Sequence, residues 1–422
     1  MCQWHMSSTD RSGAETWECV ARSNPQAQTL QAMKGMKTLR SGRNRRKWIY
    51  VLLLMGLLGL SGCGSPSSAS VEMSSQTELV KTGSMELQYA ENFAVDYYED
   101  GYKMLTTLPD SKRYLLVPEG QPVPRGLDED VSILQEPLQN IYLVASGVMD
   151  MFASVDAVDQ IRFSGQKQEN WYIQTAKDAM AAGDMIYAGK YSKPDYELLV
   201  SEGCDLAIEN RMITHSPEVV EMLQSFDIPV MIEYSSYEQH PLGKVEWVKF
   251  FGALTGKEAE AEEAFAEQTE ILEEVESGEK TGKTIAFFYV TSNGLIQVRQ
   301  STDYIPKLIE LAGGRYIFED LEDSGSGRST LNMQVEDFYA GAKDADILIY
   351  NSSIDGGVTT VDELIGKCNI LKDFKAVQEG QVYCTTNDMY QQSMAIGYLL
   401  QDMHTVLTDD DTAKLRYLFL LQ

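Results

Sequence analysis

The sequence predicts an α/β protein of two Rossmann-like lobes, each a mainly parallel sheet flanked by helices, joined by one long helix with a ligand cleft between the lobes. Three observations support this class. Short apolar runs alternate with helical segments after about residue 110, as expected of strand–helix units. The stretches 197–209 and 336–350 share one design: an acid opens a helix, a small-residue turn follows, and an aspartate precedes an aliphatic run. A helical segment rich in alanine and glutamate separates the two stretches.

The first lobe is predicted over residues 85–241. Its expected strands lie at 113–118, 140–146, 161–165 and 205–209. A helix is expected after the second strand, and Pro194 marks the start of another, because proline is favoured in the first turn of a helix. A further unit of helix, turn and strand ends near Ser235. Strands that alternate with helices in this way favour a parallel sheet.

The linking segment is predicted over residues 242–278, and the second lobe over 279–422. Within the linking segment, apolar side chains recur at roughly helical intervals at Ala261, Phe265, Leu272 and Val275. We therefore expect a rigid helical bridge rather than an open loop. The second lobe repeats the design of the first, with strands expected within 283–294, 345–353 and 379–388, and helices within 304–314, 335–342 and 391–407.

A signal for export occupies the region before the lobes. Five basic residues lie within 40–47, an apolar run follows over 48–60, and small residues then surround Cys63. This order is typical of an export signal, and Leu60-Ser61-Gly62-Cys63 resembles the lipobox of bacterial lipoproteins. We expect residues 1–62 to form the signal region, with an over-extended start at 1–35. Cys63 is then the lipidated first mature residue, and 63–84, rich in Ser, Gly and Thr, is a flexible leash.

Composition limits the partners of the chain. The formal net charge is −28, and so acidic a surface repels nucleic acid and anionic headgroups. We therefore expect no nucleic-acid partner and attachment to the membrane through lipid alone. Apart from the anchor, the mature region has Cys204, Cys368 and Cys384, without the spacing of a metal site. Cys368 and Cys384 either pair in an oxidising compartment or remain buried thiols.

Polar residues that follow the expected strands indicate the ligand site, because open parallel sheets bind ligands beyond the carboxyl ends of their strands. Residues selected by this rule are Ser146, Gly147, Asn210, Arg211, Tyr234, Ser235, Ser292, Asn293, Asn351, Ser352, Asn387 and Tyr390. Tyr191 and Trp171 lie in loops expected to reach the same gap. Arg211, Arg299 and Arg328 are the arginines expected to meet an anionic cargo.

Taken in order, these motifs resemble the substrate-binding lipoproteins of ABC importers that carry iron-siderophores, haem or cobalamin. The resemblance spans about residues 110–405 and rests on the lipobox and on PDYELLVSEGCDLAIE, FDIPVMIE, LIELAGG and VEDFYAGAKDADILIY. It implies a protein without catalysis or resident cofactor, anchored to the outer face of the cytoplasmic membrane. Its partners are an ABC permease with a cytoplasmic ATPase and an iron or corrinoid complex, and we expect a monomer.

The resemblance also implies that one carboxylate on each lobe docks on the permease, and by position these are Glu197 and Glu336. For Glu197 a second interpretation stays open, since a carboxylate in the first turn stabilises a helix through its dipole.

Two other functions stay open at this stage. A binding protein for bare zinc or manganese would use histidines, of which the mature region holds His215, His240 and His404. A surface hydrolase is less favoured, because Gly-x-Ser-x-Gly and His-Glu-x-x-His are absent from the sequence. The TGKT at 281–284 lacks the earlier glycine of a phosphate loop and precedes a strand instead of following one.

Overall fold

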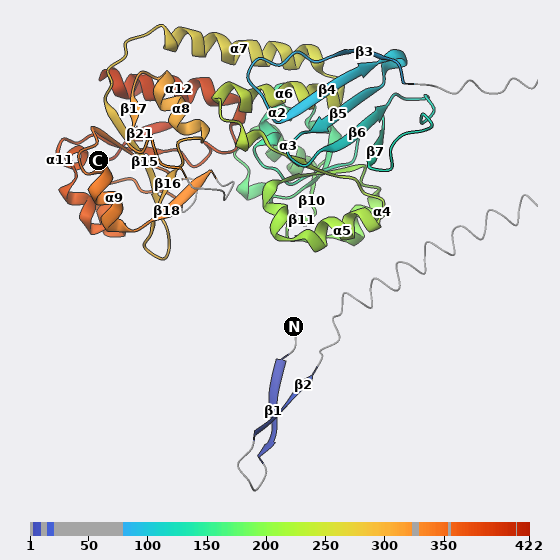
Figure 1. The fold of residues 1–422 in the computed structure, drawn as a ribbon, viewed down its shortest axis with the longest axis horizontal. Helices are drawn as coiled ribbons and strands as arrows, with labels where there is room; N and C mark the ends of the chain where they lie inside the picture. Colours follow the sequence, from blue (N-terminus) through green and yellow to red (C-terminus); the bar gives the residue numbers. More distant parts are fainter. Residues whose placement is uncertain (1–2, 10–14, 21–78, 323–328, 353–355, 411) are drawn as a thin grey trace, which may run out of the picture. The chain divides into compact units, whose positions relative to one another are not determined.

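The computed structural model describes residues 3–9, 15–20, 79–322, 329–352, 356–410 and 412–422. The chain divides into two compact units, Met1–Ser74 and Ser75–Gln422 (Figure 1). In the first unit, β1 (Gln3–Thr9) pairs antiparallel with β2 (Glu15–Val20), and no motif in the sequence predicts this pair of strands. Cys63 lies outside the described residues. Among the residues described, no helix combines the length and apolar character needed to span a membrane.

The second unit opens with a five-stranded sheet that precedes the first lobe. Its strands, in spatial and chain order, are β3 (Lys81–Ser84), β4 (Phe93–Tyr98), β5 (Lys103–Thr107), β6 (Lys112–Val117) and β7 (Val131–Gln135). All neighbours are antiparallel except β6 and β7. The strand expected at 113–118 is therefore β6 of this separate sheet and not part of the parallel sheet. Short turns with positive φ at Asp100, Gly101 and Ser111 reverse the chain, which allows antiparallel pairing.

The first lobe is built on a parallel sheet in the order β10-β9-β8-β13-β14. The strands are β8 (Ile141–Leu143), β9 (Ile161–Ser164), β10 (Ile186–Tyr187), β13 (Leu206–Asn210) and β14 (Val230–Glu233). Helices α2 (Val148–Ser154) and α3 (Gln174–Ala182) cover one face, and α4 (Tyr196–Glu202) and α5 (Pro217–Ser225) cover the other. The predicted α/β class is confirmed here, together with the strands expected at 140–146, 161–165 and 205–209.

The connection between the lobes consists of two helices rather than the single helix predicted. Helix α6 (Pro241–Thr255) ends at Gly256, whose φ of 72° is the left-handed conformation that glycine adopts at a helix end. Helix α7 (Glu258–Glu276) then begins within two residues. Because residues 241–254 of α6 are all buried, α6 is a core helix, whereas α7 carries its glutamates on an exposed side.

The second lobe holds a seven-stranded mixed sheet in the order β18-β16-β15-β19-β20-β21, with β17 also paired to β15. Strands β15 (Thr284–Val290), β17 (Arg315–Tyr316), β19 (Ile347–Tyr350) and β20 (Val382–Thr385) are parallel. Strands β16 (Ile296–Arg299), β18 (Thr330–Met333) and β21 (Leu418–Leu420) run antiparallel to their neighbours. The helices are α8 (Tyr304–Leu311), α9 (Val335–Ala342), α10 (Val361–Lys367), α11 (Lys375–Gln378) and α12 (Ile396–Thr408). Cys368 and Cys384 are both buried thiols, without a disulfide between them.

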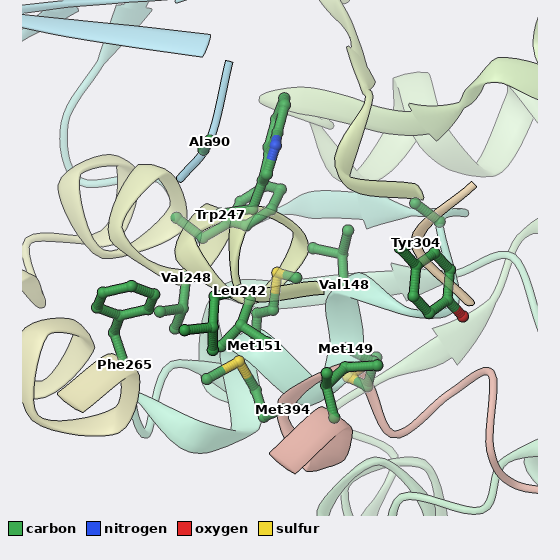
Figure 2. Packing of buried hydrophobic residues seen from close by; sticks show 14 of the residues in the cluster. Ala90, Val148, Met149, Met151, Leu242, Trp247, Val248, Phe265, Tyr304 and Met394 are labelled. Atoms are coloured by element: carbon green, nitrogen blue, oxygen red, sulfur yellow. The ribbon is translucent and has the colours of Figure 1, made fainter. Parts of the chain in front are cut away.

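One apolar cluster runs through both lobes. It takes side chains from α2 of the first lobe, from α6 and α7, and from α8 and α12 of the second. Figure 2 shows part of this packing, with Met151, Leu242, Trp247 and Met394 gathered around the turns of α6. The two lobes therefore share one hydrophobic core.

Gly252 sets how closely α6 and α7 approach each other. A Cβ atom added there would lie 2.5 Å from the Cβ of Ala261 and 3.0 Å from the carbonyl oxygen of Lys257. Gly252→Ala is therefore expected to lower the free energy of unfolding by about 1–3 kcal/mol, the usual cost of overpacking a core. Gly366→Ala in α10 is the control, because a Cβ there meets no atom within 4 Å, and better helix propensity adds up to ~1 kcal/mol. Urea unfolding measures both, and equal effects of the two substitutions would refute the close contact.

Candidate functional site

Polar side chains gather where the parallel strands of the first lobe end. Ser146 and Gly147 follow β8, Asn210 closes β13, and Glu233 closes β14. Because these strands are neighbours in one parallel sheet, their carboxyl ends lie along the same edge. The second lobe faces this edge with Arg299 at the end of β16 and with the loops around α8 and α12.

A cavity of about 240 Å³ lies between the lobes at this edge. Its wall takes residues from the first lobe, from α6 and from the second lobe: Ala145, Ser146, Gly147, Asn210, Arg211, Met212, Glu233, Ser235, Ser236, Tyr237, Lys244, Arg299, Tyr304, Ser329, Tyr390 and Ser393. We call it the cleft cavity. Three cationic side chains and one carboxylate line it, so in a chain of net charge −28 it is a positive site within an acidic protein.

Arg299 is held in place by groups of the second lobe. Its Nη1 lies 3.2 Å from Oδ2 of Asp303, and its Nη2 donates a hydrogen bond to Oη of Tyr390. Nδ2 of Asn351 donates to the same oxygen at 2.6 Å. Since the Tyr390 oxygen accepts twice, its own proton is left to donate to another acceptor. Burial raises the pKa of Asp303, and the Arg299 charge offsets part of that rise.

Glu233 and Lys244 are buried charged residues of the cavity wall. Oε2 of Glu233 accepts hydrogen bonds from the backbone N–H of Ser235 at 2.8 Å and from its hydroxyl at 2.5 Å. The ammonium of Lys244 lies 4.7 Å from the ring centroid of Tyr304, a cation–π contact. Burial raises the pKa of Glu233 and lowers that of Lys244, because both charged forms lose solvation there. The charge of each partly offsets the effect on the other.

Another part of the cavity wall is aromatic and cationic. The Arg211 guanidinium lies 4.7 Å from the ring centroid of Tyr237, and Tyr237 remains 37% exposed. A stacked arginine beside an accessible phenol suits a flat or conjugated ligand that also carries anionic groups.

Two further cavities lie beside the cleft cavity. One of about 330 Å³ shares Ser146 and Tyr390 with the cleft cavity. The other, of about 550 Å³, shares Gly356 and Asn387 with the 330 Å³ cavity. Because each cavity shares lining residues with the next, the three lie next to one another.

The structure brings together many of the residues selected from the sequence. The cleft cavity is lined by Ser146, Gly147, Asn210, Arg211, Ser235, Arg299 and Tyr390. Asn351 reaches this group through Tyr390, and Ser352 and Asn387 line the 550 Å³ cavity. Their roles in binding stay predictions.

Other selected residues lie elsewhere. Tyr234 is buried in the shared core and Tyr191 packs against the apolar cluster around Tyr142. Trp171 is also buried, and its Nε1 donates to Oγ of Ser164 at 3.1 Å. Ser292 and Asn293 lie in the exposed turn after β15, where Asn293 accepts from Thr291 at 2.6 Å. Arg328 lies outside the described residues.

Several residues that line the cleft cavity were not predicted from the sequence as ligand-site residues: Glu233, Tyr237, Lys244, Tyr304, Ser329 and Ser393. Tyr304 had a usable signal, because it opens a predicted helix, and helix N-termini gather around ligands. Lys244 had none, since it falls within the linking segment, where a lysine normally faces solvent.

The three histidines serve different local roles. His240 stacks on Tyr89 with ring centroids 4.4 Å apart and accepts from the N–H of Leu242 at the start of α6. Nδ1 of His404 lies 2.9 Å from the carbonyl oxygen of Ala312, and His215 is exposed. Across the described ranges, no group of three or more His, Cys, Asp or Glu side chains is placed to hold a metal ion.

The two carboxylates expected to meet a permease are both at the surface. Glu197 lies in the first turn of α4 and Glu336 in the first turn of α9. The side chain of Asp195 already caps α4 by accepting from the N–H of Leu198 at 3.1 Å. Glu197 therefore has no capping task of its own among the described residues, although it still favours the helix dipole.

Comparison with known proteins places the chain among extracytoplasmic binding proteins. A family model described as periplasmic binding protein matches residues 144–389. An uncharacterized lipoprotein of Methanocaldococcus jannaschii is 24% identical over 394 residues, which cover 85% of this chain and 92% of that protein. A second uncharacterized lipoprotein of the same organism is 23% identical over 367 residues, or 82% and 90% of the two chains.

Solved structures share the fold at low sequence identity. A possible iron-binding, periplasmic solute-binding protein from Staphylococcus epidermidis has a TM-score of 0.50 and 17% identity, with 64% of this chain and 98% of that chain covered. The periplasmic haem binding protein HutB of Vibrio cholerae has a TM-score of 0.51 and 14% identity, with 63% and 98% covered. A protein of the Fe³⁺-hydroxamate transport system from Saccharomonospora viridis has a TM-score of 0.50 and 17% identity, with 64% and 93% covered.

Proposed function

Because the chain belongs to the periplasmic binding protein family, we propose that it delivers an iron chelate, either a ferric siderophore or haem, or else cobalamin, to an ABC importer permease. As a member of that family it is a solute-binding protein of the ABC-transporter class. The observation that carries the proposal is the cleft cavity, in which Arg211, Lys244 and Arg299 converge from both lobes and from the helix between them. A site assembled from both lobes suits capture of a ligand between them.

The chemistry of the cavity favours this cargo class. Tyr237, Tyr304 and Tyr390 supply aromatic surface and hydroxyl groups beside the three cations. Iron chelates, haem and corrinoids are large, carry conjugated or flat parts and often bear anionic groups, so such a wall complements them. The printed names of the structural neighbours, which mention iron, Fe³⁺-hydroxamate and haem, support the same class. We propose that the protein acts by binding alone.

The remaining parts of the proposal concern attachment and docking. Cys63 is the proposed lipid anchor on the outer face of the cytoplasmic membrane, in keeping with the lipoprotein names of the relatives. Glu197 and Glu336, one exposed on each lobe, are the proposed contacts with the permease. Two separated carboxylates on one body allow a partner to recognise the spacing of the lobes.

A melting screen tests the proposal. Haem, cobalamin, a ferric hydroxamate and a ferric catecholate are each added to the protein without its signal region. The correct cargo is expected to stabilise the protein by RT ln(1 + [L]/Kd), about 2.7 kcal/mol at a hundredfold excess over Kd. Metal-free forms of the same ligands are the control.

Three outcomes would count against the proposal. A midpoint that rises with zinc or manganese alone would favour the metal-ion alternative. Turnover of an ester, peptide or glycoside would favour the hydrolase. If none of the chelates raised the midpoint, the proposed cargo class would be wrong.

A further inference from the structure

Lys244 carries the least exposed charge in the wall of the cleft cavity. Its side chain, on the first turn of α6, is 3% exposed, against 6% for Glu233 and 9% for Arg299. Burying an ammonium group costs several kcal/mol unless a partner replaces the lost water. A lysine at such a position therefore requires a partner of its own.

The protein supplies that partner only in part. The ammonium lies over the ring of Tyr304 at 4.7 Å. Among the residues that the structure describes, none forms a hydrogen bond or an ion pair with it. A cation–π contact leaves the three N–H donors of an ammonium without acceptors.

The other buried charges of the wall are already engaged. Arg299 is held by Asp303 and Tyr390. Glu233 is engaged by the N–H and the hydroxyl of Ser235. Lys244 thus differs from its neighbours in presenting unused donors to a cavity whose wall carries more cations than carboxylates.

We propose that Lys244 binds an anionic oxygen, carboxylate or phosphate, of the cargo and makes the cleft select anionic complexes over neutral ones. This inference rests on the proposed function and names the chemical group of the cargo that the site recognises. An ammonium is a compact point charge that accepts carboxylate and phosphate alike. Because Lys244 is buried, its attraction for an anion is stronger than that of a lysine at the surface.

Binding of defined probes to Lys244→Met tests the inference. Methionine keeps the length and apolar stem of lysine and removes the charge. Lys307→Met is the matched control, because the Lys307 side chain is 38% exposed and its ammonium pairs with Glu310 at 2.9 Å on the surface of α8. Haem and ferric citrate present carboxylates, cobalamin presents a phosphate, and a neutral ferric trihydroxamate presents neither. Calorimetric titration gives Kd for each probe with each protein.

The expected result is selective. Lys244→Met raises Kd at least ~10-fold for the carboxylate or phosphate probe that the wild type binds. For the neutral trihydroxamate the change stays below ~3-fold, and Lys307→Met changes neither value. The empty Lys244→Met protein melts at the same temperature as the wild type or higher, because a buried charge without full compensation has been removed. Lower stability of the empty variant together with unchanged Kd values would mean a purely structural lysine and overturn the inference.

The outcomes separate this inference from the proposed function. If the wild type binds the neutral trihydroxamate and none of the anionic probes, the role of Lys244 is refuted while the proposed function stands. Equal losses for anionic and neutral probes in Lys244→Met also refute it. If the wild type binds no probe at all, both proposals are wrong.

Discussion

Glu246→Gln is expected to lower the free energy of unfolding by about 3–5 kcal/mol, because it removes a buried acceptor on which a whole chain segment depends. Glu246 on α6 is fully buried. Its Oε1 accepts from the N–H of Gln88 at 2.8 Å, and its Oε2 accepts from those of Tyr89 and Ala90, both at 2.8 Å. Glutamine has the same shape but turns one acceptor into a donor, which then faces backbone donors.

A second carboxylate continues this arrangement. Oε2 of Glu238 accepts from the N–H of Glu91 at 2.9 Å, and Oε1 accepts from Asn92 at 3.0 Å and from Nε1 of Trp247 at 2.9 Å. Five consecutive backbone N–H groups, 88–92, are thus satisfied by two side chains. Through them the sheet β3–β7, which precedes the parallel lobe, is tied to α6 and the shared core.

Urea unfolding and hydrogen exchange measure the effect of Glu246→Gln. Amides 88–90 are expected to exchange faster in the variant, while those of β15 keep their protection until the whole protein opens. Glu263→Gln on the exposed side of α7 is the control and should change stability by less than ~0.5 kcal/mol. If both substitutions cost the same, Glu246 does not hold the segment.

The second large effect concerns Glu209, whose carboxylate is buried on β13. Neither of its oxygens has a hydrogen-bond partner among the described residues. Burial raises the pKa of Glu209 from the ordinary 4.5 to about 8. The unfolded chain therefore releases this proton near pH 4.5 and the folded chain only near pH 8, so the unfolded state binds fewer protons in between. The contribution of Glu209 to stability is therefore fully present below pH 4.5, and it is lost as the pH rises toward and through 8.

Glu209→Gln removes this titration while it keeps the shape of the side chain. At pH 5 the variant and the wild type are expected to have similar stability. At pH 8 the variant is expected to be more stable by roughly 4 kcal/mol, since burial raises the pKa from 4.5 to about 8 and each pKa unit corresponds to about 1.4 kcal/mol. Denaturant unfolding across this pH range measures the difference. Glu221→Gln, exposed on α5, is the control and should follow the wild type at every pH. A constant difference between Glu209→Gln and the wild type would show that Glu209 does not titrate in this range.

The sequence predicts the ligand edge of the first lobe well because the signal there is local. Each buried strand shows as an aliphatic run, and the polar residue that ends the run marks its carboxyl end. Ser146, Asn210 and Arg211 follow from that rule and line the cleft cavity. The rule is weaker in the second lobe, where Ser292 and Asn293 follow β15 but sit in the exposed turn to antiparallel β16.

What the sequence did not predict depends on contacts between distant segments. Lys244 looks like a surface residue until the burial of α6 on all sides is known. Glu246 and Glu238 are meaningful only once residues 88–92 lie against them. The single linking helix was predicted from the apolar spacing of 261–275, which lies entirely in α7. The left-handed backbone of Gly256 shows that α6 ends before that helix begins. Apart from the strand at 113–118, the sheet β3–β7 was missed because no α-helix separates its strands, so they lack the strand–helix alternation on which the prediction was based.

The structure of the protein saturated with the chelate that raises its melting midpoint tests the central claim most directly. The account predicts one ligand in the cleft cavity, in contact with residues of both lobes, with an anionic oxygen within hydrogen-bond distance of the Lys244 ammonium and another group near Arg299 and Tyr390. A ligand bound to the outer face of one lobe, with the cleft cavity unchanged between the two, would contradict it.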